Sequence, residues 1–168
     1  MINLKRLLFA ATSMFLSSAA FSQISLPQNT IVTENFNALG SSATAALPAA
    51  WKMSSAGTGA TATYAGGTNL TATTQAASSG LPSGGGRYNW ATTAGTDRAM
   101  GFLTDAGYAS PNAIMAHYRN TTGATVNSVN ISFSIERYVV NTSTASVAFF
   151  YSTDGTTWTA VPNGDVST

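Results

Sequence analysis

The sequence predicts an all-β protein whose antiparallel strands stack face to face in two layers, as a β-sandwich. Apolar and polar residues take turns at every second position in several segments, which is the period of a half-buried strand. Turn-forming sequences such as Asp-Gly separate these segments. The chain is also rich in small polar residues and only 8% charged, a composition typical of secreted β-proteins.

The clearest strand is predicted over residues 128–140, SVNISFSIERYVV. Val129, Ile131, Phe133 and Ile135 alternate there with serine and asparagine. In a helix the same residues would spread around the axis instead of forming a stripe. We therefore expect a strand with one buried face and one face in water.

Other strands are expected wherever the alternation returns. A first strand is predicted over 30–39, and a short extended piece begins at Trp51. Apolar residues on both faces of 146–152 predict a central strand. Between 54 and 86 the composition falls to small residues, so loops and thin edge strands are expected. Three further strands are predicted over 86–93, 98–103 and 114–119.

The turns between strands are marked by particular residues. Asp154-Gly155 stands between two apolar runs, and this dipeptide is a strong hairpin signal because glycine adopts positive φ without strain. Asp154 is therefore interpreted as a turn residue and not as a catalytic acid. A second turn is expected over 120–123, NTTG.

The N-terminus has the layout of a secretory signal peptide. Lys5 and Arg6 precede an apolar run over 7–16, and small residues follow up to a cleavage site predicted after Ser22. The alternative, a membrane anchor, is disfavoured because the apolar run is too short and no second run of about 20 apolar residues follows. We expect a signal peptide over 1–22, a single β-sandwich domain over 23–168, and a secreted or cell-surface protein.

Charge and residue usage exclude several functions. Lys5 and Arg6 are two of the seven basic residues, and the other five stand against six acidic residues. No basic patch is therefore available to bind nucleic acid. The chain has no cysteine, which excludes disulfides and thiolate metal sites. His117 is the single histidine and lacks a nearby carboxylate, so it is interpreted as a satisfied or surface residue and the chain as non-catalytic.

Several short motifs, taken in order, resemble a known module. They are ENFNALG, LPAAW, GRYNW, DRAMGFL, NTTG, ISFSIERY and YSTDGTTWT, and together they span about residues 30–161. This series resembles the N-terminal β-sandwich module of large bacterial surface and secreted proteins, often exported by type IX secretion. The resemblance implies a jelly-roll or laminin-G-like sandwich. Because such modules continue into longer chains, it also implies one that is incomplete at its C-terminus and lacks one or two strands.

Candidate binding residues follow from chemistry. Tyr88, Trp90, Tyr118 and Tyr138 are the aromatics most able to stack on a sugar ring, and Arg137 precedes the last of them. The alternative is that they belong to the core, as aromatics in a sandwich usually do. Glu34 and Asp97 are the first choices for calcium ligands, since calcium prefers hard oxygen donors. Their spacing matches no EF-hand loop, and acids on loops are common for solubility.

The leading hypothesis is an exported, non-catalytic binding or adhesion module for a glycan or another component of the cell surface or extracellular matrix. One alternative is an accessory N-terminal domain of a secreted hydrolase, a nuclease or glycosidase whose catalytic part lies elsewhere. The other alternative is a structural spacer. No cofactor is expected apart from calcium.

Overall fold

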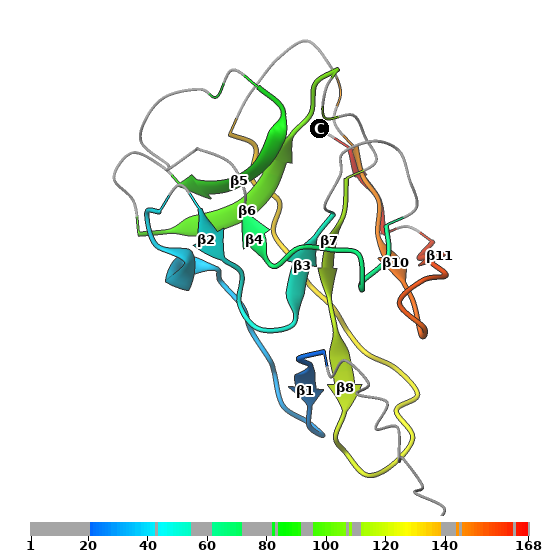
Figure 1. Cartoon of the computed structure of the whole chain (residues 1–168). Helices are drawn as coiled ribbons and strands as arrows, with labels where there is room; N and C mark the ends of the chain where they lie inside the picture. The colour runs from blue at the N-terminus through cyan, green and yellow to red at the C-terminus, as the bar shows by residue number, and fades with distance from the viewer. Residues whose placement is uncertain are drawn as a thin grey trace, which may run out of the picture.

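The computed structural model describes an all-β protein of short strands (Figure 1). It describes residues 21–42, 44–54, 62–71, 82, 84–91, 96–106, 108, 112–138, 144, 146–162 and 164–167. The predicted leader, apart from its last two residues, and much of 54–86 lie outside these ranges. The only helical element within them is the 3-10 turn η1 (Asn37–Leu39), and no described helix is long and apolar enough to cross a membrane.

The strands follow one another as β1 to β12. Their bounds are β1 (Ile24–Leu26), β2 (Ala45–Ala46), β3 (Trp51–Met53), β4 (Leu70–Thr71), β5 (Gly86–Ala91), β6 (Arg98–Leu103), β7 (Ile114–Ala116), β8 (Tyr118–Asn120), β9 (Ser146–Val147), β10 (Phe150–Tyr151), β11 (Thr159–Ala160) and β12 (Val166–Ser167).

Across the described residues these strands form six two-stranded sheets. Five pairs are antiparallel: β5–β6, β3–β7, β2–β4, β10–β11 and β9–β12. The sixth pair, β1–β8, is parallel, with Ile24 opposite Tyr118. The expectation of a wholly antiparallel arrangement is therefore wrong for the N-terminal strand, which joins a strand far along the chain instead of an adjacent hairpin partner.

The longest pair, β5–β6, confirms two of the predicted strands. Tyr88 and Trp90 lie on the same side of β5 and are almost fully buried, at 2% and 7% exposed. Asn89 points to the other side and is fully buried as well. Its side-chain amide donates to the carbonyl oxygen of Gly40 at 2.7 Å, which attaches the loop after η1 to this strand. Both faces of β5 are thus covered.

The hydrophobic core lies beside this pair. Leu39, Ala45, Leu47 and Met53 form a buried cluster, and the partly buried side chains of Phe36, Trp51, Met100 and Phe102 pack against it. The cluster draws on η1, β2, β3 and β6, so the small sheets share apolar contacts even though they do not share hydrogen bonds. The short extended piece predicted at Trp51 is confirmed as β3.

The first predicted strand, 30–39, is wrong. Its polar side chains bond to nearby backbone amides, which competes with a strand. The Glu34 carboxylate accepts the amide of Phe36 at 2.7 Å, and the Asn35 side chain accepts the amide of Asn37 at 3.1 Å. Phe36 has φ of 59°, a left-handed value that no strand accommodates, and η1 follows directly.

The strand predicted most strongly, 128–140, is also wrong for the residues that the structure describes. No strand is assigned between 128 and 138, although Figure 1 draws this yellow segment as a long extended trace. Val129, Ile131 and Phe133 are 53%, 49% and 49% exposed. The alternation is present, but no described strand supplies the backbone hydrogen bonds that would turn an extended segment into part of a sheet.

The region 146–152 is not a central strand. It divides into β9 and β10, which pair with different partners, and Val147, Phe150 and Tyr151 are each more than 40% exposed. The strand predicted over 114–119 exists but is interrupted at His117, which separates β7 from β8.

Both predicted turns are confirmed. Gly155 has φ of 72°, and the Asp154 carboxylate accepts the amides of Thr156 and Thr157, each at 2.7 Å. These bonds hold the pKa of Asp154 well below its usual range. At the second turn Gly123 has φ of 75°, and the Asn120 side chain accepts the amide of Thr122.

Candidate binding site: the Lys52–Tyr64 cleft

Three of the predicted sugar-binding aromatics do come together. The Tyr88 and Trp90 ring centroids are 4.9 Å apart, and Tyr138 stacks on Trp90 at 5.3 Å with 16° between the rings. Gly101, on β6, makes room for this stack: a Cβ there would lie 2.9 Å from the indole nitrogen of Trp90. The end of segment 128–138 is thereby attached to β5.

Burial leaves these rings little free surface. Tyr88 and Trp90 are covered, and only Tyr138 is half-buried. The Tyr138 hydroxyl donates to the Glu136 carboxylate. Burial, this hydrogen bond and the neighbouring negative charges raise the pKa of Tyr138. A sugar platform on this stack stays a prediction, because the rings mainly face one another.

The other predicted ligand residues lie elsewhere or point outward. Tyr118 is on β8, opposite Ile24 of β1 and 37% exposed. Arg137 is exposed at the end of segment 128–138. The five predicted ligand-binding residues therefore do not form one site.

The two predicted calcium ligands also serve other purposes. The Glu34 carboxylate is engaged with the Phe36 amide, and Asp97 lies exposed just before β6. The side-chain oxygen of Asn37, three residues after Glu34, accepts the Arg98 amide at 2.8 Å. Within the described ranges, no three His, Cys, Asp or Glu side chains are grouped so that they could hold a metal ion.

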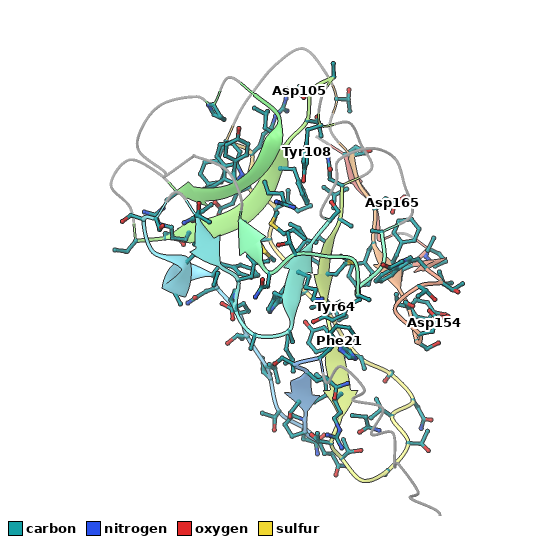
Figure 2. All side chains as sticks on the ribbon, in the orientation of Figure 1. Phe21, Tyr64, Asp105, Tyr108, Asp154 and Asp165 are labelled. Carbon is teal, nitrogen blue, oxygen red and sulfur yellow. The ribbon has the colours of Figure 1, made fainter. Side chains whose placement is uncertain are left out.

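A different place has the shape of a binding site. A cleft of about 550 Å³ opens beside β3, within the size range of small-molecule sites. Figure 2 shows the labelled side chains of Tyr64 and Phe21, two residues of the cleft, one above the other. The cleft is lined by Phe21, Ser22, Leu47, Pro48, Ala49, Ala50, Trp51, Lys52, Tyr64, Gly67, Thr68 and Asn69.

Lys52 supplies the only charged group in this lining. Its ammonium lies 4.6 Å from the ring centroid of Phe21 and 4.7 Å from that of Tyr64. The two rings meet edge to face, with centroids 5.6 Å apart. A cation over an aromatic face contributes about 0.5–1 kcal/mol at a partly exposed site. The cleft thus combines a hydrogen-bond donor with aromatic surface.

Tyr64 is fixed in place by backbone partners. Its hydroxyl donates to the Ala50 carbonyl oxygen at 3.0 Å, and its amide donates to the Gly155 carbonyl oxygen at 2.9 Å. Tyr64 is 7% exposed, and burial raises its pKa, so the phenol stays neutral. The Asp154–Gly155 turn therefore supports the wall of the cleft.

Lys52 is positioned by close packing around a glycine. A Cβ on Gly67 would lie 2.8 Å from the terminal methyl of Met115 and 3.0 Å from the Cβ of Lys52. A side chain at position 67 would therefore crowd Met115, Lys52 and the Met53 carbonyl oxygen, 3.1 Å from that Cβ.

His117 lies behind this wall and not in the lining. Its ring is 5.0 Å from that of Tyr64, and its Nε2 is 3.0 Å from Nε2 of Gln23. Its Nδ1 is buried, and no hydrogen-bond partner for it occurs among the described residues. These described contacts of His117 include no carboxylate.

Lys52 and Tyr64 were not among the candidate residues from sequence. They stand 12 positions apart, and Tyr64 is a single aromatic in a stretch of small residues. The pairing of Met53 with Thr68 and the bond from the Tyr64 hydroxyl to Ala50 bring the two segments together, and no local pattern reveals such contacts.

Comparison with family models, curated proteins and solved structures finds no match for this chain.

Proposed function

We propose that this chain is an exported, non-catalytic β-module that binds glycans through the Lys52–Tyr64 cleft. The single observation that carries the proposal is the Tyr64 ring, which lies beside the Lys52 ammonium in the open cleft. A pyranose has a six-membered ring of similar size, and its CH face packs favourably on an aromatic side chain. The Lys52 ammonium donates one hydrogen bond to the Ala65 carbonyl oxygen at 3.5 Å, and its two other N–H groups can donate to sugar hydroxyls.

The polarity of the lining supports a sugar as ligand. Thr68 and Asn69 present hydroxyl and amide groups beside the apolar Leu47 and Pro48. Sites that bind small molecules combine apolar surface with a few polar groups in this way. Because the cleft has a single cation, neutral or singly acidic sugars suit it better than polyanions.

As its architecture we propose the two-layered, jelly-roll-like sandwich expected from sequence. The pairs β2–β4, β3–β7 and β5–β6 lie beside one another and share the core, which suits one layer. Segment 128–138 and the region of β9 and β10 are the candidates for the second layer, because Phe133 stacks on Phe149 with centroids 5.8 Å apart.

The test is binding of the exported protein to an array of immobilised glycans, with calcium and with chelator. We expect binding that Lys52→Ala and Tyr64→Leu each weaken at least tenfold. Arg119→Ala is the matched control, because Arg119 is an exposed cation on β8 outside the lining, and it should leave binding unchanged. Loss of binding in chelator would support the calcium expectation.

Two outcomes would redirect the assignment. Absence of binding to any glycan would contradict the proposal and favour the structural spacer. Binding that survives both cleft substitutions but is lost in Tyr138→Ala would move the site to the aromatic stack on β5.

A further inference from the structure

Segment 128–138 presents an unusual amount of apolar surface to solvent. Four large apolar side chains on one face of it are between 39% and 53% exposed, namely Val129, Ile131, Phe133 and Ile135. No strand is assigned to residues 126–136, and no described residue forms a backbone-to-backbone hydrogen bond with them. An extended backbone of this kind is a template on which another strand can pair.

The sequence of the segment does nothing to discourage such pairing. Natural proteins protect an unpaired strand with lysine, with other charged residues or with proline. Residues 120–135 contain no charged residue and no proline, and the first charge is Glu136, near the end of the segment.

The segment is also held in place before any partner arrives. The Phe133 ring stacks on that of Phe149, and the Tyr138 ring stacks on that of Trp90. A strand that is already positioned loses less conformational freedom when it pairs, so more of the pairing energy remains as affinity.

We propose that two copies of this chain associate by antiparallel pairing of segment 128–138 about a two-fold axis at Ser132. Closed two-fold dimers are the commonest homo-oligomers, and their interfaces use the same surface of both copies. The dimer presents two Lys52–Tyr64 clefts, but its formation does not depend on the proposed glycan binding.

The apolar pattern of the segment is complementary to itself in this register. Residues directly opposite one another in an antiparallel pair point to the same face. Ile131 then lies opposite Phe133 of the second copy, and Val129 lies opposite Ile135 of the second copy. All eight apolar side chains therefore meet on one face, while serine and asparagine occupy the other.

Charge selects the antiparallel orientation over a parallel one. A parallel pair in register would place Glu136 beside Glu136 and Arg137 beside Arg137, and like charges directly opposite one another are destabilising. In the antiparallel register centred on Ser132, Glu136 lies opposite Ser128 and Arg137 lies opposite Asn127. No like charges face one another across the pair.

The absence of cysteine makes the register directly testable. Ser132→Cys introduces a single thiol that faces its own copy at a Cα separation of about 5 Å, which a disulfide can bridge. Mild oxidation should therefore link most of this variant into dimers. Ser128→Cys is the matched control, because two such positions lie eight residues apart along the pair, about 26 Å, and should not be linked.

A mixed sample sharpens the assignment of the register. Asn130→Cys and Ser134→Cys lie opposite one another in the proposed pair, so a mixture of the two variants should form disulfide-linked heterodimers. Neither variant should be linked by itself, because identical positions are then about 13 Å apart.

Sedimentation equilibrium measures the association without a cross-link. The wild-type chain should form dimers reversibly as its concentration rises, and Ile131→Lys should weaken this association at least tenfold by placing a charge among apolar side chains. Ile31→Lys is the control, because Ile31 is 88% exposed and lies outside the segment. At dilutions where the wild type is monomeric, all three chains should melt alike, which guards against a folding defect.

Three results would overturn the dimer as proposed. The first is a wild-type chain that stays monomeric up to its solubility limit. The second is linkage of Ser128→Cys as readily as of Ser132→Cys, which indicates parallel or non-specific association. The third is a dimer that Ile131→Lys leaves intact, which places the interface elsewhere. None of these measurements involves a glycan, so failure of the dimer and failure of the proposed function are distinguishable.

Discussion

The β5–β6 pair and segment 128–138 have the same alternation of apolar and polar residues but opposite outcomes. In β5, Tyr88 and Trp90 are buried, whereas Ile131 and Phe133 are each 49% exposed. Alternation determines which side chains share a face of an extended segment. It does not determine whether another strand lies alongside, and that second condition decides between core and surface.

The difference lies in the partners that each region finds. β5 pairs in full register with β6, and Asn89 ties its other face to Gly40. Segment 128–138 contacts the rest of the protein through ring stacking at Phe133 and Tyr138. Because these ring contacts are not accompanied by backbone hydrogen bonds to a described strand, apolar residues such as Val129 and Ile131 stay about half exposed.

The largest effect is expected for removing the indole of β5. Trp90→Ala should lower the free energy of unfolding by about 3–5 kcal/mol, because it leaves a cavity among Tyr88, Tyr138 and Gly101. Urea denaturation measures this change. Phe133→Ala is the comparison in the other region and should cost less than about 1.5 kcal/mol. Equal losses would mean that segment 128–138 is as well packed as β5.

A smaller loss is expected from adding one methyl group. Gly101→Ala places a Cβ 2.9 Å from the Trp90 nitrogen and should cost about 1–3 kcal/mol by overpacking. Gly84→Ala is the matched control, since a Cβ there meets nothing within 4 Å and the change should stay within about 0.5 kcal/mol. Thermal unfolding of both variants would contradict the close packing if they melted alike.

The β10–β11 hairpin offers a third case, held by a turn rather than by burial. Because folding lowers the pKa of Asp154, its stabilising contribution is complete above the usual carboxyl range and is lost progressively as pH falls from that range through the lowered pKa. Protection factors for hydrogen exchange at Tyr151 and Thr159, which divide out the pH dependence of intrinsic exchange, should therefore fall as the pH drops below about 4. Asp154→Ala should exchange fast at every pH, and a pH-independent wild type would contradict the turn geometry.

The smallest effect is expected within segment 128–138 itself. Ile131→Ser should change the free energy of unfolding by no more than about 0.5 kcal/mol, because the side chain is already half in water. A loss above about 2 kcal/mol in chemical denaturation would show that Ile131 is buried in solution, and would restore the strand that the sequence predicts.

Much of the local structure could be predicted from sequence. The Asp154-Gly155 and NTTG turns, β3, β5 and β6 all follow from short-range rules that need no knowledge of the partner. The prediction of a strand over 30–39 was wrong because the Glu34 and Asn35 side chains accept backbone amides two residues ahead. These local hydrogen bonds compete with a strand, and the alternation of apolar and polar residues gives no sign of them.

The candidate site was less accessible from sequence. Tyr88 and Trp90, two aromatics of the predicted sugar platform, lie on one face of β5 as the alternation predicts. The sequence does not reveal how deeply they are buried. The cleft depends on contacts between β3, residues 64–69 and Phe21, which no spacing rule connects. Phe21 was considered only as part of the leader.

The parallel pairing of β1 with β8 has a consequence for the order in which the chain folds. Gln23 and His117, at the start of this contact, are 94 positions apart. When a chain crosses a membrane N-terminus first, β1 emerges long before its partner β8. Ile24 and Leu26 then have no paired strand until β8 emerges. In the export that we propose, the N-terminal strand therefore stays unpaired until β8 has emerged, and a chaperone that shields extended apolar segments would act on it first.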